Sequence, residues 1–225
     1  MFITVNGIRL HYEVSGKGPA VILVHGNGED HRIFKETVDL LVKDFTVYAL
    51  DSRGHGKSSG KENISYDKMA KDVAEFIRLL ELDRPIYCGF SDGGIIGLVA
   101  AVKYPRLFSR MVICGANAYP EGMKRRWLIL FGLLGFLFRD PKVFMMLNEP
   151  QISGKELEQI SIPTLILAGE RDMVLPSHTE YLASKIKTSY LRILPGETHG
   201  SYVIHSRKLY FCMKKFIMNR KQAET

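Results

Sequence analysis

Apolar residues along the chain fall into two patterns that alternate from the second residue almost to the end. Short continuous apolar runs are typical of buried strands, and apolar residues three and four positions apart are typical of helices packed on a sheet. The runs expected to be strands are 2–5, 8–14, 20–24, 45–50, 86–90, 110–114, 164–168 and 190–194. Helical spacing covers residues 30–43, 66–80, 94–103, 177–186 and 206–218. Asn6-Gly7 predicts an opening hairpin. The alternation after it predicts an α/β fold with a mostly parallel, twisted sheet and helices on both faces.

One segment interrupts this alternation. Residues 119–159 are rich in Phe, Leu and Met and end with a capping box at Ser153 and Glu156. We therefore expect residues 1–118 and 160–225 to form the core, and 119–159 to form a small helical cap inserted into it. Its longest apolar run, 127–138, is too short to span a bilayer as a helix. Because apolar residues surround this run, we expect a buried lid helix over an apolar pocket. Weak contact with a membrane surface through Lys124-Arg125-Arg126 is the alternative.

Candidate chemistry lies where the predicted strands end. Gly89-Phe90-Ser91-Asp92-Gly93 follows an apolar run and opens a helix, which is the setting of a G-x-S-x-G nucleophile elbow. The sharp turn of an elbow leaves room only for small residues two positions either side of the serine, and glycines stand at both places. We therefore expect Ser91 to be a nucleophile that attacks an acyl carbon.

Two further side chains complete this chemistry. A serine hydroxyl is a weak nucleophile at neutral pH, so it needs a base, and His199 could take its proton. Asp172 would hold the imidazole in the required tautomer. The backbone N–H groups of Asn27 and Asp92 would stabilise the oxyanion. Each residue alone has a structural explanation as a turn, surface or capping residue, but their order and their places after strands favour a catalytic triad.

Composition narrows the class of protein. The 31 Lys and Arg exceed the 24 Asp and Glu, but they are spread along the chain without interleaved aromatic residues, so nucleic acid is not an expected partner. Cys88, Cys114 and Cys212 have no C-x-x-C spacing, and the N-terminus lacks the regions of a signal peptide. Both observations favour a reducing, cytoplasmic location. The sequence leaves the oligomeric state open.

Two other kinds of site are not expected. Gly56-Lys57-Ser58 lacks the earlier glycine that a P-loop needs, which excludes a nucleotide triphosphatase. None of the histidines pairs with another ligand at metal-binding spacing, so no metal is implied. His25 and His55 are expected to shape loops. The triad chemistry itself requires no cofactor.

With these residues in place, the chain resembles the α/β-hydrolase superfamily over nearly its whole length, which implies the α/β-hydrolase fold. The resemblance rests on Val24-His25-Gly26-Asn27-Gly28, the elbow, Asp172, His199 and the block Asp51-Ser52-Arg53-Gly54-His55-Gly56-Lys57-Ser58. Epoxide hydrolases and haloalkane dehalogenases share this last block but carry Asp as the elbow nucleophile. Here the glycines frame Ser91 instead, so the resemblance implies acyl hydrolysis through a seryl intermediate.

A closer resemblance is local. Residues 89–95, 103–105 and 115–119 are similar to the biphenyl-hydrolase-like, or valacyclovir-hydrolase-like, group, which hydrolyses amino-acid esters. The match skips the cap, which usually builds the substrate pocket. The resemblance implies a cofactor-independent serine hydrolase of small carboxylic esters, with α-amino-acid esters as a narrower hypothesis. Lactones, carbon–carbon bond substrates and a non-catalytic binding role are the alternatives.

Asp92 gives the amino-ester hypothesis a physical basis. A carboxylate beside an oxyanion hole opposes the developing negative charge by about 4 kcal/mol at about 4 Å and an effective dielectric of about 20. An ammonium group on the substrate would relieve this repulsion, which makes Asp92 a candidate ammonium receptor. The alternative is that Asp92 stabilises the first turn of its helix, where the dipole favours an acid.

Overall fold

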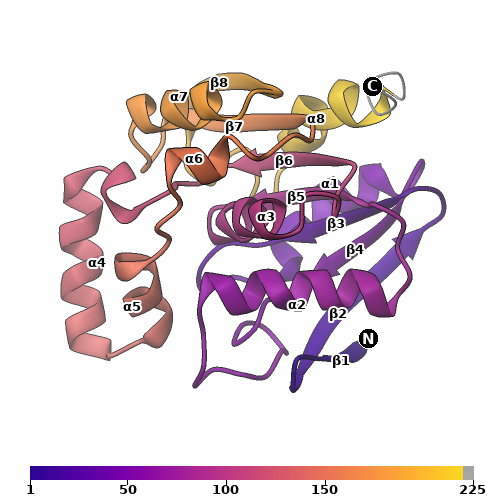
Figure 1. The fold of residues 1–225 in the computed structure, drawn as a ribbon, viewed down its shortest axis with the longest axis horizontal. Coiled ribbons are helices and arrows are strands. Elements are labelled where there is room, and N and C mark those ends of the chain that lie inside the picture. The colour runs from indigo at the N-terminus through magenta and orange to yellow at the C-terminus, as the bar shows by residue number, and fades with distance from the viewer. Residues whose placement is uncertain (220–225) are drawn as a thin grey trace.

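The computed structural model describes residues 1–219 and places their eight strands in one sheet (Figure 1). The strands are β1 (Phe2–Val5), β2 (Ile8–Gly16), β3 (Ala20–Val24), β4 (Thr46–Leu50), β5 (Ile86–Phe90), β6 (Arg110–Cys114), β7 (Thr164–Arg171) and β8 (Ser189–Thr198). Their order across the sheet is β1-β2-β4-β3-β5-β6-β7-β8. β2 pairs antiparallel with β1 and β4, and the remaining pairs are parallel. The predicted mostly parallel sheet is confirmed.

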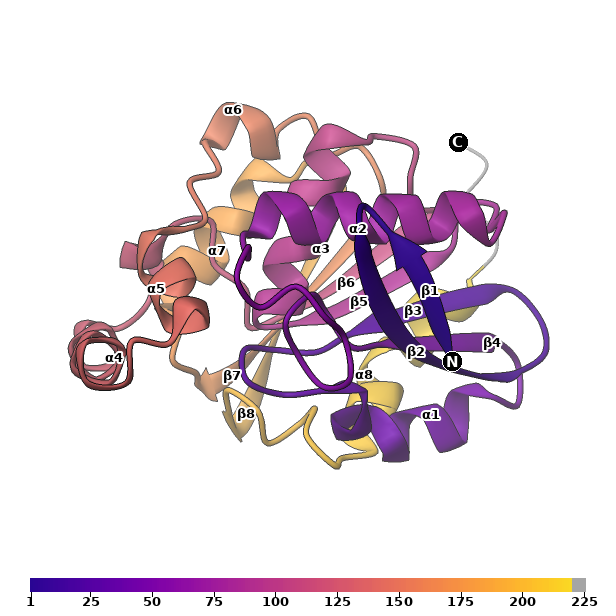
Figure 2. The same cartoon turned by 90° about the horizontal axis from the view of Figure 1, so that it is seen from below.

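Helices cover both faces of the sheet, as predicted (Figure 2). The helical elements are η1 (His31–Phe34), α1 (Lys35–Leu41), α2 (Tyr66–Leu79), α3 (Asp92–Lys103), η2 (Pro120–Gly122), α4 (Arg125–Phe138), α5 (Pro141–Asn148), α6 (Gly154–Leu157), α7 (Pro176–Lys185) and α8 (Lys208–Met218). In Figure 2, α2, α3 and α7 lie on one face of the sheet, and α1 and α8 lie on the other. The capping box of Ser153 and Glu156 is present at the start of α6.

Two apolar cores result from this arrangement. One lies between the sheet and α2, α3 and α7, and α2 contributes Met69, Val73 and Phe76 at the helical spacing seen in the sequence. The other lies under α1 and α8 and includes Phe34 and Met213. Since strands β3, β5 and β6 are buried on both faces, their carboxyl ends are held rigidly. A rigid strand end can position a side chain accurately at the edge of the sheet.

Strands β7 and β8 are longer than their apolar runs predicted. They remain paired as far as Arg171 and Thr198, after a register shift between Gly169 and Arg171. The added ends are mostly polar, and β8 is an edge strand with an exposed outer side. Apolar patterning therefore could not reveal this extension.

The expectation that residues 127–138 form a buried lid helix is wrong in one respect. The run is helical, as α4, but its outer side is exposed, and only Gly135 in α4 is buried. Helix α4 packs mainly on α5 rather than on the sheet, so only one side is covered (Figure 1). Within the described chain, none of the helices has the length and apolar character needed to cross a membrane.

Candidate active site

Ser91 lies at the turn between β5 and α3, in a strained backbone conformation with φ 52° and ψ −116°. The glycines around it are required by space. A Cβ at position 89 would lie 2.2 Å from the Gly93 carbonyl oxygen, and one at position 93 would lie 2.0 Å from the Val24 carbonyl oxygen. Such strain in a non-glycine residue persists only where its surroundings hold it. The backbone N–H of Ser91 donates to Cys114 O at 2.7 Å.

The structure brings Ser91, His199 and Asp172 into one hydrogen-bonded chain. His199 Nε2 lies 3.0 Å from Ser91 Oγ, and His199 Nδ1 lies 2.6 Å from Asp172 Oδ1. With Nδ1 donating to Asp172, Nε2 is free to accept the serine proton. This is the geometry that a nucleophile, a base and an orienting carboxylate require.

The extended pairing of β7 with β8 explains why Asp172 and His199 meet. Each is the residue after the last paired position, Arg171 and Thr198, so the two leave parallel strands side by side. Gly115 then gives the imidazole ring its space. It has φ 61°, and a Cβ there would lie 2.8 Å from His199 Cε1 and 2.9 Å from Nδ1. The sequence patterns did not indicate this role for Gly115. Its position directly after β6 was the available signal.

The surroundings of Asp172 favour its ionised form. Burial raises the pKa of this carboxyl group. The hydrogen bond and charge of His199, together with the backbone N–H groups of Val174 and Gly169, lower the pKa by a larger amount. The net pKa of Asp172 lies below its ordinary value. A carboxylate that stays ionised can stabilise a protonated His199.

Of the two residues whose N–H groups are proposed to bind the oxyanion, Asp92 directly follows Ser91 and Asn27 lines the same cavity as Ser91. The N–H of Asp92 belongs to the first turn of α3, where a helix offers it no internal acceptor. The N–H of Asn27 has no acceptor among the described residues. The Asn27 side chain donates through Nδ2 to Asp92 Oδ2 at 2.9 Å and to Lys142 O at 3.1 Å. Asn27 thus ties its loop to the start of α3 and to α5.

The Asp92 carboxylate turns into the protein interior. Its Oδ1 accepts from the Tyr66 hydroxyl at 2.9 Å, its Oδ2 accepts from Asn27, and the residue is 3% exposed. Burial raises the pKa of Asp92 to about 6, although these two hydrogen bonds oppose the rise. Asp92 is therefore satisfied by neutral donors, and it does not border the cavity beside Ser91.

Glu29 is a second carboxylate near Ser91, and no sequence motif indicated it. Its Oε2 accepts from the Gly26 N–H at 3.0 Å. A Cβ placed on Gly26 would be 2.8 Å from Glu29 Oε2 and 3.1 Å from Ser91 Cβ. Glu29 Oε2 and Ser91 Cβ are therefore at most 5.9 Å apart. Burial raises the pKa of Glu29, while the Gly26 N–H and the charge of His199 oppose the rise. Its place in the loop with Asn27 was the only sequence signal.

A cavity of about 350 Å³ opens beside Ser91 and His199. Its apolar walls come from both the core and the helices α4 and α5. The lining residues are Gly26, Asn27, Glu29, Phe90, Ser91, Phe131, Val143, Met146, Met173, His199, Gly200 and Ile204. The segment between β6 and β7 therefore contributes part of the wall, as a lid would.

Three other polar residues meet away from Ser91. His11 Nδ1 and His31 Nδ1 lie 2.9 and 2.6 Å from the Asp51 carboxylate, and the three residues bring one ligand atom each within 4.8 Å. They are 40 and 20 positions from Asp51 in sequence, so spacing did not reveal the cluster. They could hold a metal ion, but they already satisfy one another, and Asp51 also accepts from the N–H groups of His31 and Lys57. The cluster therefore anchors the loop that follows β4.

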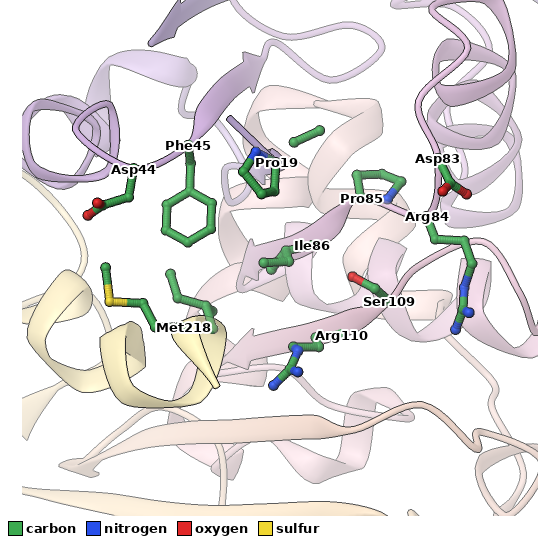
Figure 3. Close-up of a pocket in the computed structure, with 12 residues that line it drawn as sticks. Pro19, Asp44, Phe45, Asp83, Arg84, Pro85, Ile86, Ser109, Arg110 and Met218 are labelled. Carbon is green, nitrogen blue, oxygen red and sulfur yellow. The ribbon is translucent and has the colours of Figure 1, made fainter. Parts of the chain in front are cut away.

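Figure 3 shows a second cavity, of about 500 Å³, at the opposite edge of the sheet. Pro19, Pro85 and Arg110 lie in it, at the starts of β3, β5 and β6. Ligands of open α/β sheets bind at the carboxyl ends of the strands. Ser91, Asp172 and His199 lie at the carboxyl ends of the strands, so we place the candidate active site at Ser91.

Comparisons with known proteins show the family and the fold of the chain. Residues 19–154 match the family model of the α/β hydrolase fold. The serine hydrolase BPHL of Homo sapiens is 30% identical over 234 residues, which cover 89% of this chain and 80% of that protein. This confirms the resemblance to the biphenyl-hydrolase-like group.

Solved structures show the same fold. A thermophilic esterase from Thermogutta terrifontis matches with a TM-score of 0.82 and 22% identity, covering 100% of this chain and 99% of that one. The enol-lactonase from Burkholderia xenovorans matches with a TM-score of 0.78 and 21% identity, covering 96% and 98%. The predicted fold class is therefore confirmed, and the chain belongs to the α/β hydrolase fold family.

Proposed function

We propose that the protein hydrolyses small carboxylic esters through a seryl acyl-enzyme. The observation that carries the proposal is the chain of hydrogen bonds from Ser91 Oγ through His199 to Asp172, which opens on an apolar cavity. The cavity volume of about 350 Å³ is at the lower end of small-molecule sites, which favours a small substrate.

The mechanism follows from the contacts. His199 Nε2 takes the proton of Ser91 as Oγ adds to the ester carbonyl carbon. The resulting oxyanion accepts hydrogen bonds from the N–H groups of Asn27 and Asp92. His199 then returns the proton to the leaving alcohol, and the carbon–oxygen bond to it breaks. His199 next takes a proton from a water molecule as the water oxygen adds to the acyl carbon, and returns it to Ser91 Oγ as the bond between Oγ and the acyl carbon breaks. The carboxylic acid leaves, and Asp172 stabilises the imidazolium in both halves of the reaction.

An α-ammonium group on the acyl part is the substrate feature that we propose in addition. The ammonium nitrogen of an α-amino ester lies two bonds from the carbonyl carbon, so it would be within a few ångströms of Ser91 Oγ. Glu29 borders the cavity and lies within 5.9 Å of Ser91 Cβ, which is within reach of such a group. Asp92 is close as well, but both of its oxygens already accept hydrogen bonds. We therefore favour Glu29 over Asp92 as the ammonium receptor.

The nucleophile is tested with Ser91→Ala. Removing a triad serine lowers turnover by about 10⁴-fold or more, measured with p-nitrophenyl esters of varied chain length. A fluorophosphonate probe should label Ser91 in the wild type and leave the variant unlabelled. Retained turnover or unchanged labelling in Ser91→Ala would exclude this mechanism. Labelling without turnover of esters, lactones or carbon–carbon substrates would point to a binding protein.

The ammonium receptor is tested with an α-amino ester and its des-amino analogue. Glu29→Gln keeps an acceptor for the Gly26 N–H and removes the charge, so kcat/KM should fall about tenfold or more for the amino ester only. Asp92→Asn is the matched variant, in which the preference should persist. Unchanged preference in Glu29→Gln with loss in Asp92→Asn would assign the receptor to Asp92. No preference in the wild type would end the amino-ester proposal and leave ester hydrolysis standing.

A further inference from the structure

Helices α4 and α5 lie on the periphery of the molecule (Figures 1 and 2). They expose several large apolar side chains. Phe136 is 83% exposed and Phe138 is 73% exposed. We call the exposed surface of these helices the outer cap face, and its large apolar members are Ile129, Leu130, Leu133, Phe136, Leu137, Phe138 and Phe144. Monomeric proteins rarely leave so many large apolar side chains together in water, so the outer cap face requires an occupant.

The spacing of these residues shows that the exposure is organised. Ile129, Leu133 and Phe136 are four and three positions apart, which places them on one side of α4. The opposite side of α4 faces the rest of the protein. Phe131 lines the cavity beside Ser91, and Gly135 is buried beside Val143 of α5. One side of α4 thus serves the cavity, and the other is presented outwards.

Cations stand at both ends of the outer cap face. Between residues 124 and 142, the basic residues Lys124, Arg125, Arg126, Arg139 and Lys142 accompany a single acid, Asp140. This is a net charge of +4, out of +7 for the whole chain. Lys124 donates to the Asp172 carbonyl oxygen at 2.6 Å and Lys142 lies 3.7 Å from Asp140, so Arg125, Arg126 and Arg139 are the cations that the outer cap face presents. Arg125, Arg126 and Arg139 are exposed and, among the described residues, none has a carboxylate within salt-bridge distance. Cations in the first turn of α4 oppose the helix dipole, and that turn contains no acid. Helix stability therefore does not explain them.

We propose that the outer cap face binds the surface of a bilayer that contains anionic lipids. Apolar side chains flanked by basic ones are what such a surface accepts, with the apolar groups among the acyl chains and the cations at the phosphates. A second copy of the chain is a poorer occupant. In an antiparallel two-fold pairing of α4, Arg125 and Arg126 of one copy would meet Arg139 of the other.

The experiment is co-sedimentation of the full chain with vesicles. The two probes are vesicles of phosphatidylcholine alone and vesicles of phosphatidylcholine and phosphatidylglycerol in equal parts. We expect binding to the anionic vesicles only, and weaker binding at high salt. Leu133→Asp with Phe136→Asp, and Arg125→Glu with Arg126→Glu, should each lower the partition coefficient at least about tenfold.

Phe211→Asp is the matched control, because Phe211 is 64% exposed and lies on α8, apart from α4 in both views. It should bind like the wild type. All four substituted positions of the cap are exposed, so the variants should fold, and circular dichroism checks this. The proposal would be overturned if the wild type bound anionic vesicles no more strongly than neutral ones. It would also be overturned if Phe211→Asp lost as much binding as the cap variants. A dimer that is seen by light scattering in the wild type and is absent in Leu133→Asp with Phe136→Asp would also overturn the proposal. Vesicle binding is measured without substrate, so its outcome is independent of the proposed ester hydrolysis.

Discussion

Gly115→Ala is the substitution from which the structure allows the most specific prediction. A Cβ at this position would be 2.8 Å from His199 Cε1, whereas ordinary contact begins at 3.4 Å, so the ring must move by about 0.6 Å. A shift of about 0.6 Å is enough to take the 3.0 Å contact between His199 Nε2 and Ser91 Oγ out of hydrogen-bond range, so we expect this bond to be disturbed. The backbone at φ 61° adds a cost of about 1–2 kcal/mol for a residue other than glycine.

We therefore expect turnover to fall by about ten- to a hundredfold, because misplacements of this order have that effect on catalysis. The assay is kcat with a p-nitrophenyl ester, together with the rate at which a fluorophosphonate labels Ser91 and the free energy of unfolding in urea. Both kcat and the labelling rate should fall, since in the proposed mechanism both depend on deprotonation of Ser91 by His199.

Gly196→Ala is the matched control. Gly196 also has a left-handed backbone, with φ 72°, but a Cβ there would have no neighbour within 4 Å. This variant should lose similar stability and keep its turnover. The reasoning is refuted if folded Gly115→Ala keeps wild-type turnover, or if both variants lose turnover equally. The second result would mean that backbone strain, and not displacement of His199, is responsible.

Two further predictions concern buried charges. Because the pKa of Asp92 is raised from 3.8 to about 6 in the folded state, the protein should lose stability as pH rises through this interval, by on the order of 3 kcal/mol from this group. Asp92→Asn should lack this loss, so its unfolding free energy relative to wild type should increase from about pH 4 to about pH 7; an unchanged difference would contradict the burial argument. Arg53→Leu should lower the unfolding free energy by about 3–5 kcal/mol, because it leaves Asp72 buried without the partner that now donates twice at 2.7 Å. Lys35→Ala removes the exposed ion pair with Asp39 and should change the unfolding free energy by less than about 1 kcal/mol. Equal effects of Arg53→Leu and Lys35→Ala would refute the distinction between the buried and the exposed pair.

The sequence predicted the sheet and the elbow because both depend on local constraints. Short continuous apolar runs are typical of strands buried on two faces, and β3, β5 and β6 have that environment. The glycines at positions 89 and 93 indicate a crowded turn, and the structure leaves no space for a Cβ at either. Sequence reasoning was less successful with α4, because an apolar helix looks the same whether its outer side is covered or exposed.

The order of strands and motifs along the chain was enough to name Ser91, Asp172 and His199 and to predict that they converge, since parallel strands end at one edge. Their distances were decided by tertiary structure, through the polar continuation of β7 and β8 and the space that Gly115 leaves for the imidazole ring. The environments of Glu29 and Asp92 were also decided there. One carboxylate borders the cavity and the other is satisfied in the interior, because burial and hydrogen-bond partners are set by residues distant in sequence.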